Sequence, residues 1–312
     1  MQQLQAGTGG PPDAPARCTV WGMEKMKNDG LITQAYVNTF IQKRERDIHK
    51  GSCGKVLVYA GSKGMAGAAV LCARAALRTG AGLVRVSVPE ELFPILQIGV
   101  PEATCITRER LFEDLMQYSA IAIGPGLGDD IGNANMIKKI IYTTDKPVVI
   151  DADGLNLLRD DLEAMKKARA KLIITPHPGE AARLLDRKNE EINRDRLESA
   201  KGLAAVTGAV TVLKGAGSVV ATPAGKTYIN TTGNPGMATG GSGDVLTGVI
   251  AALAGQGLDP ESAAVSGVYL HGLAGDLGRD RMGEYGLIAR DIADMVALAI
   301  KSILEPGKSM EK

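Results

Sequence analysis

A series of short apolar runs, each followed by a segment with helical spacing, most constrains the fold of this chain. The expected strands are Lys55–Ala60, Gly82–Val88, Ala120–Gly124, Pro147–Ile150, Leu172–Thr175 and Val210–Leu213, and the expected helices between them are Ala66–Thr79, Ile131–Tyr142, Gly154–Ala168, Gly179–Leu185 and Glu191–Val206. Short buried strands that alternate with helices are typical of βαβ units. We therefore predict an α/β fold with a mainly parallel sheet, helices on both faces and right-handed crossovers.

The flanking segments complete this prediction. Ser218–Ala221 and Thr227–Asn230 predict a hairpin that adds an antiparallel edge to the sheet. The remaining expected helices are Ile32–Arg44 near the start and Gly243–Gly255, Pro260–Gly278 and Ala289–Leu304 at the end. We predict one domain over residues 32–304, a flexible Gly/Pro-rich extension over residues 1–31 and a tail over residues 305–312.

The composition argues against several classes of function. Lys and Arg number 36 against 35 Asp and Glu, so there is no basic excess for nucleic acid or a membrane surface. No run reaches the ~18 apolar residues of a membrane span, and the N-terminus has no signal-peptide pattern. The four cysteines are widely spread and have no C-x-x-C spacing, which is typical of a reduced compartment. We expect a cytoplasmic protein without nucleic-acid or membrane partners.

Glycine-rich loops follow two of the expected strands, and ligands of open α/β sheets bind at the carboxyl ends of strands. Ala60–Ala69 (A-G-S-K-G-M-A-G-A-A) precedes a helix, but its glycine spacing fits neither a dinucleotide fingerprint nor a P-loop. It could contact a ligand or only pack strand against helix. Ile123–Gly128 (I-G-P-G-L-G) could equally be a turn or a place where a ligand approaches the backbone.

The loop Asn234–Asp244 (N-P-G-M-A-T-G-G-S-G-D) is the strongest indication of a function. Free N–H groups of a glycine-rich turn at a helix N-terminus attract anions. Asp244 would repel a phosphate, so we expect it to take a proton from an attacking hydroxyl while nearby N–H groups hold the developing phosphate charge. Capping of the helix by Asp244 is the alternative, and it leaves the glycines unexplained.

Polar residues also follow other expected strands. His177 lies between two prolines, and we expect a function for it rather than a place in the core. Glu180 falls in the first turn of the next helix, where the helix dipole alone could explain a carboxylate. Lys214, in L-K-G-A-G-S, could meet nucleotide phosphates or belong to an ordinary hairpin turn.

Three other polar residues and one histidine stay open. The stretch V-I-D-A-D-G-L-N contains Asp151, Asp153 and Asn156, whose roles the sequence does not define, with helix capping by Asp153 as one alternative. His271 lies among small residues in an expected helix, and we interpret it as a packing residue.

Together and in this order, these stretches resemble the ADP/ATP-dependent NAD(P)H-hydrate dehydratases, a repair family of the ribokinase-like superfamily. The matching segments are H-K-G-S-C-G-K-V-L-V-Y-A-G-S, G-M-A-G-A-A-V-L, G-P-G-L-G, D-A-D-G-L-N, T-P-H-P-G-E, V-L-K-G and N-P-G-M-A-T-G-G-S-G-D-V-L-T-G. The G-S-G-D part alone is shared with many sugar and vitamin kinases. The resemblance implies a ribokinase-like three-layer fold.

The resemblance also implies a reaction and its residues. ADP (or ATP) would phosphorylate the ring hydroxyl of (6S)-NADHX or NADPHX, and loss of phosphate would give NAD(P)H and AMP (or ADP), with Mg²⁺ accompanying the nucleotide. Glu180 is similar in position to the superfamily's magnesium-associated acid, although His177 stands where that N-x-x-E motif has Asn. The implied roles are Asp244 as the base, Gly241 and Gly243 as the anion hole, Ala68, Gly126, His177 and Asp244 as contacts of the hydrated dinucleotide, and Lys214, Gly215, Ala216, Gly217, Ser218 and Gly243 as contacts of the nucleotide.

The resemblance bears on partners as well. Many family members carry an upstream epimerase domain, whereas the match here begins near Ile32. We therefore expect no fusion, and an epimerase on a separate chain as a pathway partner. A homo-oligomer, and specifically a tetramer, is implied too. The alternatives are a ribokinase-like kinase that releases a stable ester, such as a hydroxymethylpyrimidine or pyridoxal kinase, and a non-catalytic nucleotide-binding module.

Overall fold

Ten strands form one sheet in the computed structural model, which describes residues 30–305. The strand order is β1-β10-β9-β8-β7-β6-β5-β2-β3-β4. Strand β9 runs antiparallel to β8 and β10, and the other pairs are parallel. The strands are β1 (Leu31–Ile32), β2 (Lys55–Tyr59), β3 (Leu83–Ser87), β4 (Thr104–Ile106), β5 (Ala120–Ile123), β6 (Pro147–Ile150), β7 (Lys171–Ile174), β8 (Val210–Leu213), β9 (Val219–Ala221) and β10 (Thr227–Asn230).

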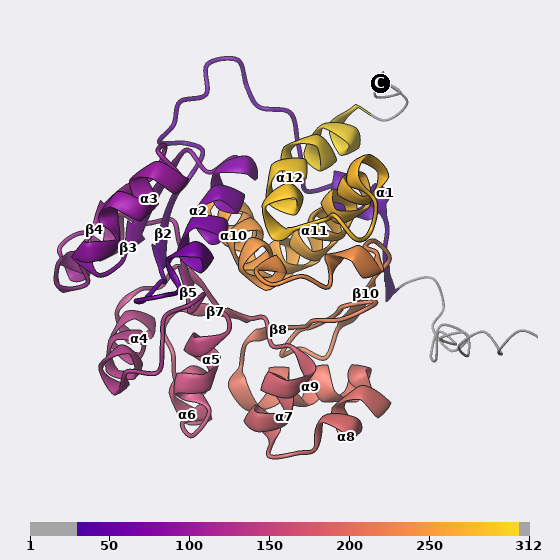
Figure 1. Cartoon of the computed structure of the whole chain (residues 1–312). Helices are drawn as coiled ribbons and strands as arrows, with labels where there is room; N and C mark the ends of the chain where they lie inside the picture. The colour runs from indigo at the N-terminus through magenta and orange to yellow at the C-terminus, as the bar shows by residue number, and fades with distance from the viewer. Residues whose placement is uncertain (1–29, 306–312) are drawn as a thin grey trace, which may run out of the picture. The chain divides into compact units, whose positions relative to one another are not determined.

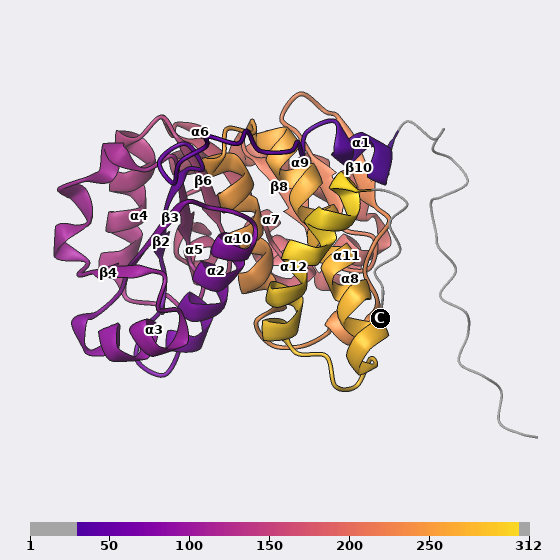
Figure 2. The ribbon, with the colours of Figure 1, turned by 90° about the horizontal axis from the view of Figure 1, so that it is seen from above.

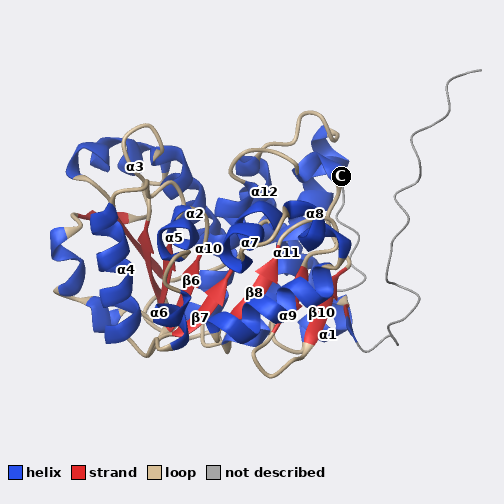
Figure 3. Ribbon diagram, turned by 90° about the horizontal axis from the view of Figure 1, so that it is seen from below, coloured by secondary structure: helices blue, strands red, loops and turns tan. Residues whose placement is uncertain are grey.

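Helices cover both faces of this sheet. Figure 1 shows α2, α10, α11 and α12 on one side of the strands and α4 to α9 on the other. Figure 2 is seen from the side of the first group, and Figure 3 from the opposite side, with the strands in red. The helices are α1 (Gln34–Asn38), α2 (Ala66–Arg78), α3 (Phe93–Gly99), α4 (Ile131–Thr143), α5 (Asp153–Leu158), α6 (Leu162–Lys166), α7 (Pro178–Leu185), α8 (Asn189–Arg194), α9 (Arg196–Thr207), α10 (Ser242–Gly255), α11 (Pro260–Met282) and α12 (Ala289–Leu304).

The apolar strands divide their side chains between two cores. Val56 and Val58 of β2 belong to the core under α2, α10, α11 and α12, whereas Leu57 and Tyr59 belong to the core under α4 and α9. Successive side chains of a strand point to opposite faces. A strand that is covered on both faces therefore needs a continuous apolar run, which confirms the predicted three-layer α/β architecture.

The start of the described chain differs from its prediction. Ile32 is not the first residue of a helix: β1 pairs with β10 in parallel, and the Ile32 carbonyl accepts a hydrogen bond from the Thr231 hydroxyl (2.7 Å). The helix is only Gln34–Asn38, and Thr33 caps it. Since β1 lies outside β10, the predicted antiparallel hairpin is present but is not the outermost part of the sheet.

Two long predicted helices are each divided by an aspartate. The segment predicted as Gly154–Ala168 is split at Asp161, whose side chain accepts from the N–H of Ala164 and caps α6. The segment predicted as Glu191–Val206 is split at Asp195, which accepts from the N–H of Glu198 and caps α9. Aspartate favours such caps over helix interiors because its oxygens compete for nearby N–H groups.

The parallel arrangement brings the loops after β2, β5, β6, β7 and β8 to one edge of the sheet. The strand order changes direction between β2 and β5, the kind of switch point where open α/β sheets bind ligands. No helix within residues 30–305 is long and apolar enough to cross a membrane. The predicted extension over residues 1–31 and the tail over residues 305–312 fall almost entirely outside the described residues, and their boundaries stay predictions.

Candidate active site

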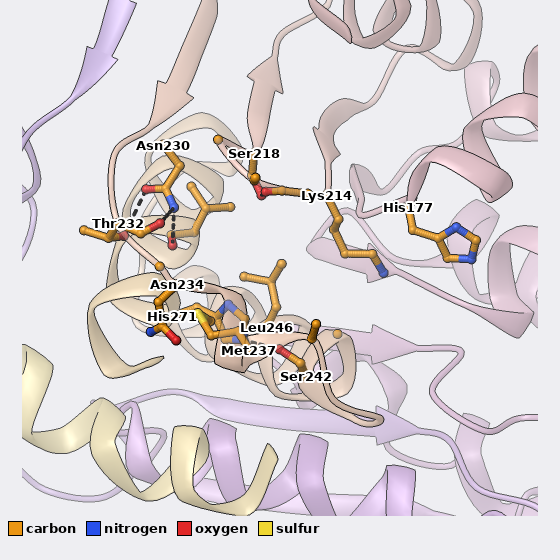
Figure 4. A pocket seen from close by; sticks show the side chains of 18 of the residues that line it. His177, Lys214, Ser218, Asn230, Thr232, Asn234, Met237, Ser242, Leu246 and His271 are labelled. Atoms are coloured by element: carbon orange, nitrogen blue, oxygen red, sulfur yellow. Dashed lines mark hydrogen bonds between the residues drawn. The ribbon is translucent and has the colours of Figure 1, made fainter. Parts of the chain in front are cut away.

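A cavity of about 800 Å³ lies at the carboxyl ends of β6, β7 and β8, beside the N-terminus of α10. This volume is typical of a small-molecule site. The cavity brings together most of the residues that the sequence singled out, although their motifs are far apart in the chain. These are Asp151, His177, Glu180, Lys214, Gly215, Ala216, Gly217, Ser218, Gly243 and Asp244. Figure 4 shows His177 toward one end of this group, with Lys214 next to it.

Asn230, Thr232 and Leu246 line the cavity without having been predicted as site residues, whereas Asn234 and Met237 belong to the predicted glycine-rich loop but had no individual role. Figure 4 places Asn230, Thr232 and Asn234 on the far side of Lys214 from His177. The Thr232 hydroxyl donates to the Tyr269 carbonyl of α11 (2.8 Å), and the Asn230 amide donates to the Val268 carbonyl of the same helix (3.2 Å). These bonds hold the loop after β10 against α11. Because the partners come from separate elements, no local sequence pattern indicates them.

His271 lines the cavity as well, so its interpretation as a packing residue alone was incomplete. Its Nε2 lies 3.3 Å from the Ser242 Oγ in the first turn of α10. Burial lowers the pKa of His271 to about 4, so the imidazole is neutral at pH 7. Val268, His271 and Gly272 all line the cavity from α11. These residues lie at positions i, i+3 and i+4, a spacing that places them on one face of the helix and that could have been recognised in the sequence.

The first turn of α10 has the form of an anion site. Gly241 is the N-cap in a left-handed conformation (φ +90°), and no side chain of the described residues caps this helix. The first-turn N–H groups of a helix lack intrahelical partners and carry the positive end of its dipole. Asp244 is the third helical residue rather than the cap, so the alternative explanation of Asp244 as the capping residue is wrong.

Lys214 is held over this turn by two carboxylates. Its Nζ lies 2.5 Å from Asp151 Oδ1 and 3.8 Å from Glu180 Oε2. The other Asp151 oxygen accepts from the Thr247 hydroxyl of α10 (2.8 Å). Burial alone would lower the pKa of the Lys214 ammonium, but Asp151 and Glu180 outweigh burial and raise it. Lys214 therefore stays charged, as a phosphate contact requires.

At Asp244, in contrast to Lys214, burial outweighs the nearby opposite charge in setting the pKa. Burial is the main cause that raises its pKa from 3.8 to about 7, and the negative charge of Asp151 adds to it, while Lys214 acts against both. A carboxylate with a pKa near the working pH can take up and release a proton at that pH. Among the ionisable groups of a cavity, such a shifted pKa marks a candidate base.

His177 and Glu180 also cap the N-terminus of α7. The His177 Nδ1 accepts from the N–H groups of Gly179 (3.0 Å) and Glu180 (3.3 Å), and Glu180 Oε2 accepts from the His177 N–H (2.8 Å). This reciprocal pair is a capping box with histidine in the place of serine or threonine. Burial and the charge of Lys214 lower the pKa of His177, so its ring is neutral. The ring lies in the cavity wall and is half-exposed.

Asp153 does not cap its helix, so that alternative is wrong as well. Ala152, with φ +48°, is the N-cap of α5, which makes Asp153 the first helical residue. Its Oδ2 instead accepts from the N–H of Gly128 (2.8 Å). Asp153 therefore fastens the loop after β5 to the end of β6. Asn156 Oδ1 accepts from Arg183 of α7 (3.1 Å), which joins two helices outside the cavity wall.

Ala68 and Gly126 do not line the cavity with Lys214 but lie next to each other. A Cβ atom built on Gly126 would be 2.9 Å from the Ala68 Cβ. This second surface stands near the first turn of α10, because Leu71 of α2 packs directly against Gly241. Two of the four predicted contacts of the hydrated dinucleotide thus lie outside the cavity, and His177 and Asp244 lie in its wall.

Alanine at Gly241 is expected to lower the free energy of unfolding by about 1–2 kcal/mol from its left-handed backbone alone. The new Cβ would also meet the Leu71 side chain and displace the α10 N-terminus. Urea unfolding followed by circular dichroism measures the change. Gly240 is the matched control, because a Cβ there would meet no atom within 4 Å and its φ is not positive. Equal losses in the two variants would contradict this account of Gly241.

The carboxylates of the site do not form a protein-built magnesium cage. Lys214 occupies the space between Asp151 and Glu180, and no group of three or more possible metal ligands occurs in residues 30–305. Protein magnesium sites commonly use one or two carboxylates together with substrate phosphates. The prediction that Glu180 associates with Mg²⁺ stays a prediction.

The sheet order, the three layers and this cavity define a ribokinase-like protein. A solved ribokinase-like superfamily protein from Enterococcus faecalis is 27% identical, with a TM-score of 0.79 over 89% of this chain and 97% of its own. The chain belongs to the NAD(P)H-hydrate dehydratase family, whose model matches residues 56–297.

Proteins with assigned names that are similar to this chain support the family assignment. The chain is similar to an ADP-dependent (S)-NAD(P)H-hydrate dehydratase of Neisseria meningitidis, 42% identical over 80% of this chain and 86% of that protein. It is also similar to a bifunctional NAD(P)H-hydrate repair enzyme of Moorella thermoacetica, 43% identical over 89% of this chain and 55% of that protein. The chain spans about half the length of such bifunctional relatives.

One solved structure extends the comparison to a nucleotide complex. The ADP/ATP-dependent NAD(P)H-hydrate dehydratase of Bacillus subtilis, co-crystallized with ATP and Mg²⁺, is 34% identical to this chain. Its TM-score is 0.79, and the alignment covers 88% of this chain and 98% of the other.

Proposed function

We propose that the protein is a nucleotide-dependent (S)-NAD(P)H-hydrate dehydratase. The observation that carries the proposal is the position of Asp244. Its carboxylate lies in the wall of one cavity with Lys214 and belongs to the first turn of α10, which no side chain caps. A base, a cation and free N–H groups are the parts that phosphoryl transfer to a hydroxyl needs.

The residues divide the proposed reaction between them. Asp244 takes the proton of the ring hydroxyl as that oxygen bonds to the terminal phosphorus of the nucleotide and the bond to the leaving nucleotide breaks. Lys214 and the first-turn N–H groups near Gly243 hold the charge on the transferred group. The C–O bond then breaks, phosphate leaves with the hydroxyl oxygen, a ring proton is lost and the ring double bond returns. With ADP, the products are NAD(P)H, AMP and phosphate.

The remaining ligands follow from the same proposal. Lys214, Gly215, Ala216, Gly217, Ser218 and Gly243 are proposed nucleotide contacts, and their presence in one cavity wall supports this. Mg²⁺, when bound to the nucleotide, would neutralise part of the phosphate charge, and no step above depends on it. A cytoplasmic location, a homotetramer and a separate epimerase as pathway partner stay predictions.

The deciding experiment incubates the full chain with (S)-NADHX and ADP, and in parallel with ATP. Recovery of the absorbance of reduced nicotinamide, together with formation of AMP or ADP, is expected. Two results would contradict the proposal. Nucleotide turnover only with a vitamin alcohol, and release of a stable phosphate ester, would indicate the related kinases. Nucleotide binding without turnover of either substrate would indicate a binding module.

The rate is expected to depend on pH through Asp244. The base acts only when it is ionised, and its pKa is about 7. We therefore expect kcat/KM to fall about tenfold per unit as pH decreases below this value, and to level off above it. His177 is not expected to cause this change, because its lowered pKa leaves it neutral there. An inflection near the ordinary aspartate value of 3.8 would contradict the assignment.

A further inference from the structure

Arg108 joins the two glycine-rich loops that follow β2 and β5. Its Nη2 donates to the Gly61 carbonyl (2.6 Å), and its Nη1 donates to Asn133 Oδ1 in α4 (3.1 Å). The Asn133 amide in turn donates to the Leu127 carbonyl (3.2 Å). Since Gly61 belongs to the first loop and Leu127 to the second, one guanidinium sets the position of both loops.

The cluster around Arg108 is closed by Tyr59 of β2. The Tyr59 hydroxyl donates to the same Asn133 oxygen (2.7 Å), and the guanidinium carbon lies 5.5 Å from the centre of the Tyr59 ring. Tyr59 is 1% exposed and Asn133 is 4% exposed. Burial raises the pKa of Tyr59 to about 12, although Arg108 acts against it, so the hydroxyl keeps its proton. Buried polar networks of this kind hold their members in one arrangement.

The guanidinium of Arg108 has one N–H group that donates no hydrogen bond among the described residues. Within the described part of the chain, its Nε is buried without a hydrogen-bond partner, and it forms no ion pair with a carboxylate. The guanidinium is only partly buried, and its charge acts on the neighbouring Glu109 carboxyl, whose pKa it helps to lower. The contacts of Arg108 with Gly61 and Asn133 are therefore what it contributes to the two loops.

The predicted dinucleotide contacts Ala68 and Gly126 depend on these loops. The Gly61 N–H donates to the Pro125 carbonyl (2.9 Å), next to Gly126. Gly126 has φ +56° and fits directly against Ala68 and Met65. A shift of Gly61 or Leu127 would therefore move Gly126. Neither Arg108 nor these loop residues line the cavity that contains Lys214.

We propose that Arg108 is a positioning residue for the hydrated dinucleotide and not for the nucleotide. It holds the surface made by Ala68 and Gly126 through Gly61 and Asn133. This inference rests on the function proposed above. It assigns the two substrates to different parts of the protein: the loops held by Arg108 position the hydrated dinucleotide, and the cavity with Lys214 positions the nucleotide.

Steady-state kinetics of Arg108→Met test the inference. The KM for (S)-NADHX is expected to rise about tenfold or more, because two hydrogen bonds to a charged group are lost. The KM for ADP is expected to stay within about twofold, since Lys214 and its loop are untouched. Arg110→Met is the matched control. Arg110 lies two residues further along and has an exposed side chain that pairs with Glu113 (3.0 Å) and, within residues 30–305, with no other carboxylate, so neither KM should change.

Arg108→Lys is the second variant. It keeps the charge but cannot donate to Gly61 and Asn133 in the same way, so a smaller rise in the KM for NADHX is expected. It carries the test alone if Arg108→Met does not fold. Equal rises in both KM values, or an unchanged KM for NADHX with a reduced kcat, would overturn the positioning role. A wild-type protein that does not convert NADHX would overturn the proposed function itself, and the two failures are thus distinguishable.

Discussion

Asp244→Asn is expected to lower the rate of nucleotide-dependent NADHX conversion about 10²- to 10⁴-fold, the usual loss when one well-placed general base is removed. The amide is close to the carboxylate in size and cannot take up the hydroxyl proton. The KM for ADP should change little, because Lys214 and the loop after β8 remain in place. The measurement is the initial rate of NADH formation at saturating ADP and NADHX, at a pH above 7, where the wild-type base is ionised.

Asp291→Asn provides a control of the same kind. Asp291 is also an acidic residue in the first turn of a helix, where it accepts from the Ile288 N–H (3.0 Å), but it does not line the cavity. The control should keep wild-type activity. Asp244→Asn should also lose the pH dependence with an inflection near 7. A variant that keeps near wild-type turnover, with the same inflection, would mean that another group is the base.

Strands could be predicted where their burial on both faces leaves a continuous apolar run in the sequence. Strand β2 is buried on both faces, so each of its residues from Val56 to Tyr59 is apolar, and the run is visible in the sequence. Strands β1 and β4 have two and three residues, too few for a recognisable pattern. What makes Leu31–Ile32 a strand is its pairing with β10, some two hundred residues later in the chain. Such pairing depends on the rest of the fold.

The candidate site could be predicted in part for a similar reason. Parallel strands send their carboxyl ends to one edge, so Lys214, His177 and Asp151 meet there once the strands are placed. The contacts between them could not be predicted. Asp151 and Lys214 are 63 residues apart, and nothing in either motif indicates the pair. His271 was interpreted as a packing residue only, and Arg108 was not singled out, because the contacts that place them join separate elements of the fold.

The Asp151–Lys214 pair gives the largest expected effect on stability. Lys214→Met leaves the Asp151 carboxylate, which is 1% exposed, with the Thr247 hydroxyl as its remaining hydrogen-bond partner among the described residues. Removing one partner of a buried pair is strongly destabilising because the other charge stays buried. The Lys214 side chain is 18% exposed, so water can reach part of the space that it leaves. We expect the free energy of unfolding to fall by about 3 kcal/mol, at the lower end of the usual range.

The double variant Lys214→Met, Asp151→Asn separates the lost charge pair from lost packing. Asparagine removes the uncompensated charge and can still accept from Thr247, so most of the lost stability should return. Urea unfolding at neutral pH measures both variants against wild type and against Lys226→Met, a control whose ammonium pairs with Glu261 on the surface (3.1 Å). ADP binding, measured by calorimetry, should stay weak in the double variant because the phosphate contact is absent. If stability does not return, the cost of Lys214→Met lies in packing and not in the buried Asp151 charge.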